Sequence, residues 1–307
     1  MSTANPAITA NPSVLRRLEL DVTRRLDGIL QGSYQGLVPG QGSELGEARV
    51  YQPGDDVRRI DWNVSARSQQ LHLRETVADR ELECWVIADR SASLDFGTAD
   101  MEKSEMALAA AAGVGFLATR GGNRVGAVIS SGAGLQTVPP RQGRLHLMAV
   151  LERISTTERA DGPARNDLGA TLQRASIVAR RRGLAVVISD FLDEPETWRH
   201  PLAALGHRHQ VLCVEVVDPR ELELPAVGVL TLVDPESGRV REIDTSRGGL
   251  RDAYAEAAAA QRLEIRQTIT GTGADHLQLR TDRDWILDLA RHITGARRRR
   301  ANVGGRR

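Results

Sequence analysis

Acidic and hydroxyl side chains follow two strand-like apolar segments of the sequence. Asp89, Ser91 and Ser93 form an Asp-x-Ser-x-Ser run after the first segment, and Asp190 directly follows a later one. Ligands of open α/β sheets bind beyond the carboxyl ends of the strands, so these positions are the first to consider as a site. Carboxylate and hydroxyl oxygens suit a hard cation, Mg²⁺ or Mn²⁺, better than zinc.

A simpler interpretation is that Asp89 and Ser91 only cap the helix that follows them. An Asp-x-Ser-x-Ser run by itself is a weak motif, and capping would then be the better explanation. The position of Asp89 at one strand end, with Asp190 at another, favours a metal site instead.

The elements that must position this site alternate along the chain. Strands are predicted at 82–88, 125–130, 135–138, 184–189, 210–217 and 276–279. Helices are predicted at 14–30, 101–119, 145–154, 168–182, 198–206, 250–270 and 282–293, and a hairpin at 229–233 and 240–243. This alternation predicts a three-layer α/β fold, with a mostly parallel central sheet flanked by helices.

Composition limits the class of protein. The chain has 307 residues, 41% of them hydrophobic and 26% charged, which is typical of a globular protein. Cys84 and Cys213 lie in apolar runs and are expected to be buried free thiols. We expect no membrane span and no signal peptide, and therefore a cytoplasmic protein.

The two ends of the chain differ from its body. The net charge is +1, and six arginines in the last twelve residues leave the remainder at −5. We expect a disordered lead at 1–12 and a basic disordered tail at 295–307, without specific nucleic-acid binding. Between them we expect an N-terminal helix, a Gly-rich loop and a charged segment at 13–80, followed by the α/β domain at 81–294.

Motifs of several enzyme classes are missing from the sequence. No Gly-x-Ser-x-Gly nucleophile motif occurs, and Lys103, the only lysine, is not part of a phosphate-binding P-loop. Ser91 stands where Asp-x-Asp phosphotransferases carry their second aspartate. We therefore expect a protein that is not an enzyme. The alternative is a metal-dependent hydrolase, a phosphatase or nuclease, that uses the same strand-end site.

The Asp-x-Ser-x-Ser run, with an aspartate after a later strand, resembles the metal-ion-dependent adhesion site of von Willebrand factor A domains. Residues 81–294 resemble that fold in the order and spacing of their elements. The family usually places a threonine where this chain has Asn166, whose amide oxygen would then be the ligand, with Asp167 or Thr171 as substitutes. The resemblance implies a metal site made by Asp89, Ser91, Ser93, Asn166 and Asp190.

A second resemblance lies upstream. Residues 49–67 read Arg-Val-Tyr-Gln-Pro-Gly-Asp-Asp-Val-Arg-Arg-Ile-Asp-Trp-Asn-Val-Ser-Ala-Arg. This run is similar to the signature of a bacterial family of unknown function that is associated with MoxR-type AAA+ ATPases. The resemblance implies a MoxR-type ATPase as the partner, with a role in chaperoning or assembling an unknown client protein. Together with the candidate metal site, we therefore expect a metal-dependent protein-interaction module.

The signature segment combines a turn sequence with clustered charges. We interpret it as a salt-bridged structural clasp, with a partner-docking surface as the alternative. The clasp predicts that Trp62 is largely buried and that at least one aspartate pairs with an arginine. The residues concerned are Asp55, Asp56, Arg58, Asp61, Trp62 and Arg67.

Overall fold

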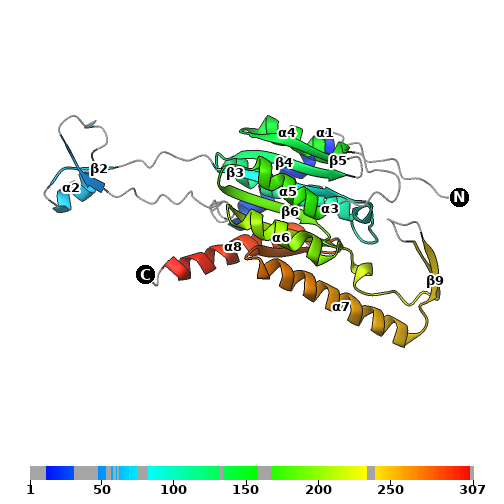
Figure 1. Ribbon diagram of the computed structural model, residues 1–307. Coiled ribbons are helices and arrows are strands. Elements are labelled where there is room, and N and C mark those ends of the chain that lie inside the picture. Colours follow the sequence, from blue (N-terminus) through cyan, green and yellow to red (C-terminus); the bar gives the residue numbers. More distant parts are fainter. Residues whose placement is uncertain are drawn as a thin grey trace.

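A mostly parallel sheet forms the centre of the computed structural model (Figure 1). The structure describes residues 12–30, 48–52, 57, 60, 62–68, 70–74, 82–131, 134–157, 167–233 and 239–304. The sheet has six strands in the order β10-β7-β6-β3-β4-β5, and only β5 is antiparallel to its neighbour. Their bounds are β3 Glu83–Arg90, β4 Arg124–Ser131, β5 Gly134–Arg141, β6 Gly183–Ser189, β7 His209–Val217 and β10 Asp275–Arg280.

The inner strands are buried because both of their faces are covered. Every residue of β6 is buried, and so are the first seven residues of β3. Alternate side chains point to opposite faces, so Val86 packs in one apolar cluster and its neighbour Ile87 in the other. This pattern explains why these segments read as continuous apolar runs.

Helices form the two outer layers. On the Val86 face lie α1 (Pro12–Leu30), α3 (Lys103–Arg120), α4 (Arg144–Thr156) and α8 (Trp285–Gly304). On the Ile87 face lie α5 (Leu168–Val178), α6 (Pro195–Gly206) and α7 (Gly248–Gly271). The predicted three-layer α/β fold is therefore confirmed.

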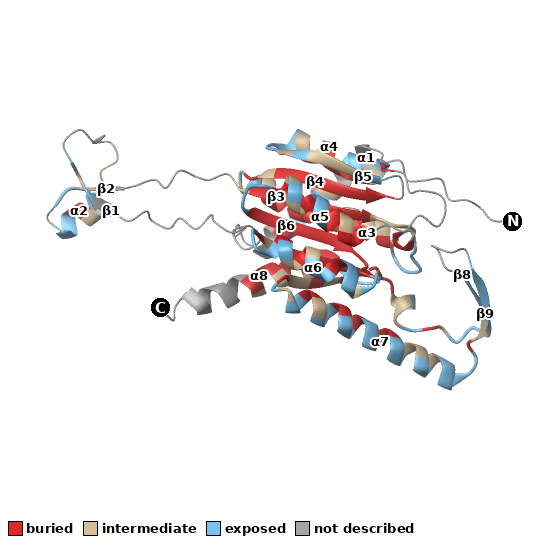
Figure 2. Cartoon of the chain, viewed as in Figure 1, coloured by how far each residue is buried: buried red, intermediate tan, exposed pale blue. Residues whose placement is uncertain are grey.

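Helix α3 is packed closely on several sides. A Cβ at Gly115 would lie 2.4 Å from Cδ1 of Leu147 in α4, and one at Gly113 would lie 2.8 Å from Cδ2 of Leu289 in α8. These glycines let neighbouring helices approach α3. Figure 2 shows buried residues concentrated in the sheet and α3, whereas α7 exposes much of its length.

Two smaller β elements complete the described structure. Strands β8 (Val229–Val233) and β9 (Val240–Asp244) form the predicted hairpin, next to the start of α7 (Figure 1). Strands β1 (Ala48–Val50) and β2 (His72–Arg74) form an antiparallel pair, and α2 (Trp62–Ser68) contacts β2. The Ser65 hydroxyl accepts a hydrogen bond of 2.9 Å from the backbone N–H of His72, which ties α2 to β2.

The prediction that Trp62 is buried is wrong, because its exposed fraction is 69%. A seven-residue helix and two three-residue strands do not form a core large enough to enclose an indole. Arg67 is exposed and makes no ion pair within the described part of the chain. The other clasp residues, Asp55, Asp56, Arg58 and Asp61, lie outside the described residues.

Two helix boundaries also differ from expectation. Helix α8 continues to Gly304, where we expected a disordered tail from residue 295. Helix α5 ends at Val178, short of the predicted residue 182, and the chain then turns into β6. Strand β6 begins at Gly183, where a Cβ would lie 1.9 Å from the carbonyl oxygen of Glu83.

Among the described residues, we find no helix with the length and apolar character needed to span a bilayer.

Candidate functional site

Adjacent parallel strands bring the two predicted aspartates to one edge of the sheet. Strands β3 and β6 pair in parallel with Ala88 opposite Ile188, so Asp89 and Asp190 both follow at the carboxyl ends. The hydroxyl of Ser189 donates a hydrogen bond of 2.8 Å to Oδ2 of Asp89 and links the two strand ends directly. Asp89 and Asp190, each expected at the end of a strand, therefore lie at the same edge of the sheet.

The Asp-x-Ser-x-Ser run forms a tight polar turn. Oδ1 of Asp89 accepts a hydrogen bond of 2.8 Å from the backbone N–H of Ser91, and the hydroxyl oxygens of Ser91 and Ser93 lie 2.9 Å apart. Ser91 precedes a short 3₁₀ helix at Ala92–Leu94, but its side chain makes no capping hydrogen bond. Helix α3 is capped by Glu102 and Glu105 instead. The structure therefore does not support the interpretation of Asp89 and Ser91 as helix caps.

Asp190 has a partner that the sequence analysis missed. The ammonium of Lys103, at the start of α3, donates hydrogen bonds of 2.8 Å to Oδ2 of Asp190 and 2.6 Å to Oε1 of Glu221. Lys103 is completely buried. Burial by itself lowers the pKa of Lys103, but the carboxylates of Asp190 and Glu221 more than offset this, and the net shift is upward. Lys103 is therefore a buried, charged counterion of Asp190.

A chain of buried charges continues from Lys103 into the sheet. The guanidinium of Arg262 in α7 contacts Glu221 at 3.3 Å, Glu215 at 3.1 Å and the carbonyl oxygen of Asp190 at 3.1 Å. Glu215 lies within β7 and is completely buried. Ionised side chains persist in an interior when they are paired and hydrogen-bonded, as these are. The network thus connects the strand-end site with α3 and α7.

Asp218 is a third strand-end aspartate, directly after β7. Its carboxylate accepts hydrogen bonds from the hydroxyls of Thr98 at 2.6 Å and Thr281 at 2.9 Å, and from the backbone N–H of Thr98 at 2.8 Å. Burial raises the pKa of Asp218, but these hydrogen bonds more than offset that effect, and the net shift is downward. Asp218 therefore anchors the loop after β3 to β7.

The remaining predicted ligand, Asn166, lies outside the described residues. Of its two possible substitutes, Asp167 caps α5 by accepting a hydrogen bond of 2.9 Å from the backbone N–H of Ala170. The hydroxyl of the buried Thr171 donates a hydrogen bond of 2.9 Å to the carbonyl oxygen of Asp167. Both substitutes are thus engaged at the start of α5.

The donor atoms of the site can be compared with the needs of a hard cation. Within the described residues, no group of three or more His, Cys, Asp or Glu side chains is arranged to hold a metal ion, so serine hydroxyls would have to contribute. Asp89, Ser91 and Ser93 gather three oxygen donors of the kind Mg²⁺ prefers. Lys103 occupies Oδ2 of Asp190, so a cation would have to share this carboxylate with the ammonium or displace it. The residues therefore fit a cation at Asp89, Ser91 and Ser93.

The fold and site define a three-layer α/β domain with an oxygen-rich cluster at the carboxyl ends of its strands. The chain belongs to the DUF58 family, a protein family of unknown function, whose model matches residues 47–264. It is 52% identical over 286 residues to the uncharacterized protein Rv1480 of Mycobacterium tuberculosis, covering 93% of this chain and 90% of that relative.

Solved structures that resemble this chain include an aerotolerance-related membrane protein from Bacteroides fragilis. It has a TM-score of 0.45 and 18% identity, and the match covers 70% of this chain and 98% of that one. Another is the von Willebrand factor A domain of SpRpn10, with a TM-score of 0.39 and 9% identity, covering 68% of this chain and 93% of that one.

Proposed function

We propose that this protein is a metal-dependent protein-interaction module and not an enzyme. The observation that carries the proposal is the gathering of Asp89, Ser91 and Ser93 at a strand end, where the serine side chains serve no helix cap. We assign Mg²⁺, or Mn²⁺, to these three residues. When bound, such a cation supplies a positive centre at which an acidic side chain of a partner can become a ligand.

The roles of the protein's own groups follow from their contacts. Ser189 and the backbone N–H of Ser91 fix the orientation of the Asp89 carboxylate. Lys103 neutralises Asp190, so the site carries less negative charge than two free carboxylates would give it. An acidic partner segment therefore meets weaker repulsion near Asp190.

The proposed partner is a MoxR-type AAA+ ATPase, and the proposed role is chaperoning or assembly of a client protein. Support for this partner comes from the signature at residues 49–67, which lies within the matched family region. Within it, the exposed Trp62 offers a large apolar side chain for contact with a partner, which favours a docking surface over a clasp.

The test is calorimetric titration of the full chain with a MoxR-type ATPase, in Mg²⁺ and in EDTA. Asp89→Asn keeps an acceptor for the Ser91 N–H but removes the charge, and it should abolish metal-dependent binding. Ser91→Ala removes one neutral ligand and should weaken binding less. Asp100→Asn removes the same charge from an exposed position beyond the turn and should bind like the wild type.

Two results would contradict the proposal. Equal affinity in Mg²⁺ and EDTA, with Asp89→Asn unchanged, would show that the strand-end cluster takes no part in binding. Metal-dependent hydrolysis of a phosphate ester or of nucleic acid by the wild type, lost in Asp89→Asn, would favour a hydrolase at the same site.

A further inference from the structure

The two edges of the central sheet are protected differently. Strand β5 carries Pro139 and Pro140, which have no backbone N–H, and its pairing with β4 contains a register shift. Prolines and irregular pairing are devices that stop another strand from adding to a sheet edge. Strand β10 has the sequence Asp-His-Leu-Gln-Leu-Arg, without proline, and pairs with β7 in unbroken register.

The outer side of β10 presents backbone groups that can pair with another strand. Thr281, which follows β10, donates its N–H to the carbonyl oxygen of Val217 at 3.1 Å. In a parallel pair, alternate residues direct both their N–H and C=O toward the neighbouring strand. Residues 275, 277 and 279 therefore face β7, and His276 and Gln278 direct their backbone groups outward.

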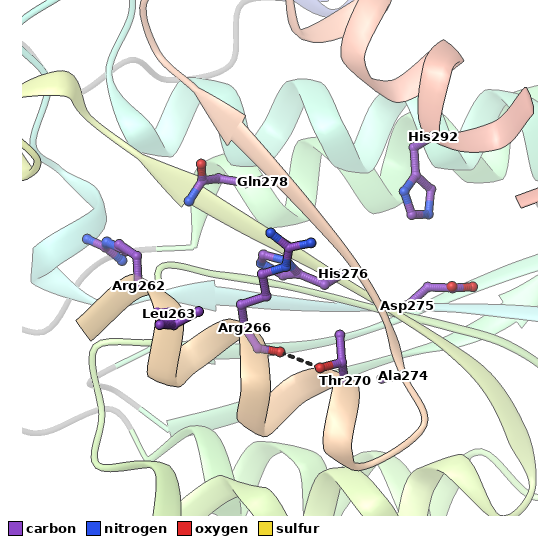
Figure 3. Close-up of a pocket in the computed structure, with 9 residues that line it drawn as sticks. All are labelled: Arg262, Leu263, Arg266, Thr270, Ala274, Asp275, His276, Gln278 and His292. Carbon is purple, nitrogen blue, oxygen red and sulfur yellow. Dashed lines mark hydrogen bonds between the residues drawn. The ribbon is translucent and has the colours of Figure 1, made fainter. Parts of the chain in front are cut away.

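A groove lies along this edge of the sheet. It has a volume of about 650 Å³, and its lining includes Arg266, Thr270, Asp275, His276, Gln278 and His292. Figure 3 shows β10 passing between α7, from which Arg266 extends, and α8, from which His292 extends. The residues with outward backbone groups thus lie in the groove.

The charge of the groove indicates the chemistry of its occupant. Arg262 and Arg266 line it together with one carboxylate, that of Asp275. Arg262 is already paired with Glu215 and Glu221. Within the described part of the chain, the guanidinium of Arg266 has neither an ion pair nor a hydrogen bond, so it is the cation available to an added chain.

We propose that the edge of β10 is a docking site for an extended acidic segment of a partner protein, which adds to the sheet as a further strand. Backbone hydrogen bonds to His276 and Gln278 would hold the segment, and an acidic side chain on its α7-facing side would pair with Arg266. A second copy of the chain would instead place its own Arg266 in the same region, where like charges repel. This edge lies to the side of the sheet, so the proposal is independent of the strand-end site.

The experiment selects peptides from a random peptide library on the full-length wild-type protein in EDTA. The selected peptides should be acidic and rich in residues that favour strands. Binding should be measured by fluorescence anisotropy, and hydrogen exchange should show protection of the His276 and Gln278 amides. Asp89→Asn should bind these peptides as the wild type does, which separates this surface from the proposed metal site.

Two pairs of matched variants locate the contact. Arg266→Gln should weaken binding about fivefold, as expected for one exposed ion pair. Gln267→Glu changes the net charge equally at an exposed position of α7 outside the groove and should change binding less than about twofold. Gln278→Pro removes one N–H at the edge and should abolish binding, whereas Gln278→Ala keeps that N–H and should retain it.

The proposal is overturned if no peptide is selected, or if selected peptides are not acidic. It is also overturned if Gln278→Pro, shown to be folded by circular dichroism, binds the selected peptides with the same affinity as Gln278→Ala. Self-association of the wild type in sedimentation, lost in Gln278→Pro, would identify a second copy as the occupant in place of a partner.

Discussion

Lys103 places a permanent positive charge inside the strand-end site. Its ammonium is completely buried and has two carboxylate partners, Asp190 and Glu221. The residue lies in the first turn of α3, where the helix dipole disfavours a cation, so these two contacts have to offset that penalty. In this way the chain supplies from its own sequence a charge that balances Asp190.

Replacing Lys103 with methionine should destabilise the protein strongly. Lys103→Met leaves the buried carboxylate of Asp190 without its cation, while the partly buried Glu221 keeps Arg262 as its partner. Breaking a buried pair in this way costs about 3–5 kcal/mol. Urea unfolding measures the loss. Lys103→Met combined with Asp190→Asn should lose less than the two single variants added together, because the charge left unpaired at Asp190 is also removed.

Mg²⁺ should stabilise the single variant Lys103→Met against unfolding more than it stabilises the wild type. Without the ammonium, Asp190 is free to join Asp89, Ser91 and Ser93 around a cation. The shift in unfolding midpoint between Mg²⁺ and EDTA should therefore be larger in Lys103→Met. An identical shift in both proteins would mean that Lys103 and a cation do not compete for Asp190.

His209 should make the stability of the protein sensitive to mild acid. Burial lowers the pKa of His209 below its ordinary value of 6.5, and the hydrogen bond to the carbonyl of Ala179 only partly offsets this. Because the folded-state pKa is depressed, the stability that His209 contributes is present above pH 6.5 and is lost as the pH falls below it. The unfolding free energy of His209→Gln should therefore decrease less than that of the wild type between neutral and acidic pH.

At the scale of elements, α3 depends on glycine for its contacts with α4. Gly115→Ala gains helix propensity of about 1 kcal/mol, but its Cβ would lie 2.4 Å from Cδ1 of Leu147. Overpacking costs roughly 1–3 kcal/mol, so we expect a net loss of stability in chemical denaturation. Gly249→Ala in α7 is the control, since no atom lies within 4 Å of the added Cβ, and it should be neutral or stabilising.

Local patterns predicted the strands and the strand-end aspartates because both depend on short stretches of sequence. Asp89 and Asp190 were identified by the apolar runs before them, and the same rule applied to 210–217 would have found Asp218. The contacts of Lys103 span 87 and 118 residues, so no local pattern predicts them. The one available signal was that Lys103 is the only lysine in the chain.

The exposure of Trp62 was not predictable for a related reason. Its neighbours in sequence suggested a charged clasp, but burial depends on whether other elements pack over the indole. The end of α5 was missed in a similar way, because the chain leaves the helix at Val178 to enter β6, which pairs with the distant strand β3. Sequence therefore predicted the order of the elements and much less of the contacts between distant ones.

At the scale of the whole molecule, the two edge strands of the sheet differ: β5 contains two prolines, whereas β10 has none and can pair with an added strand. If Pro139 and Pro140 guard β5, replacing them with Val and Thr should supply backbone N–H groups there and promote edge-to-edge pairing. We expect self-association that increases with concentration, measured by light scattering. A variant that stays monomeric at all concentrations, with an unchanged circular dichroism spectrum, would show that other features protect β5.

The burial of the only lysine has a practical consequence for chemical labelling. An acylating reagent directed at amines finds one ε-amine in this chain, and in the folded state that amine is enclosed. Apart from the α-amino group, labelling is therefore confined to molecules in which Lys103 has come out of the interior. The rate of modification at this single position, followed by mass spectrometry, reports how often the strand-end site opens.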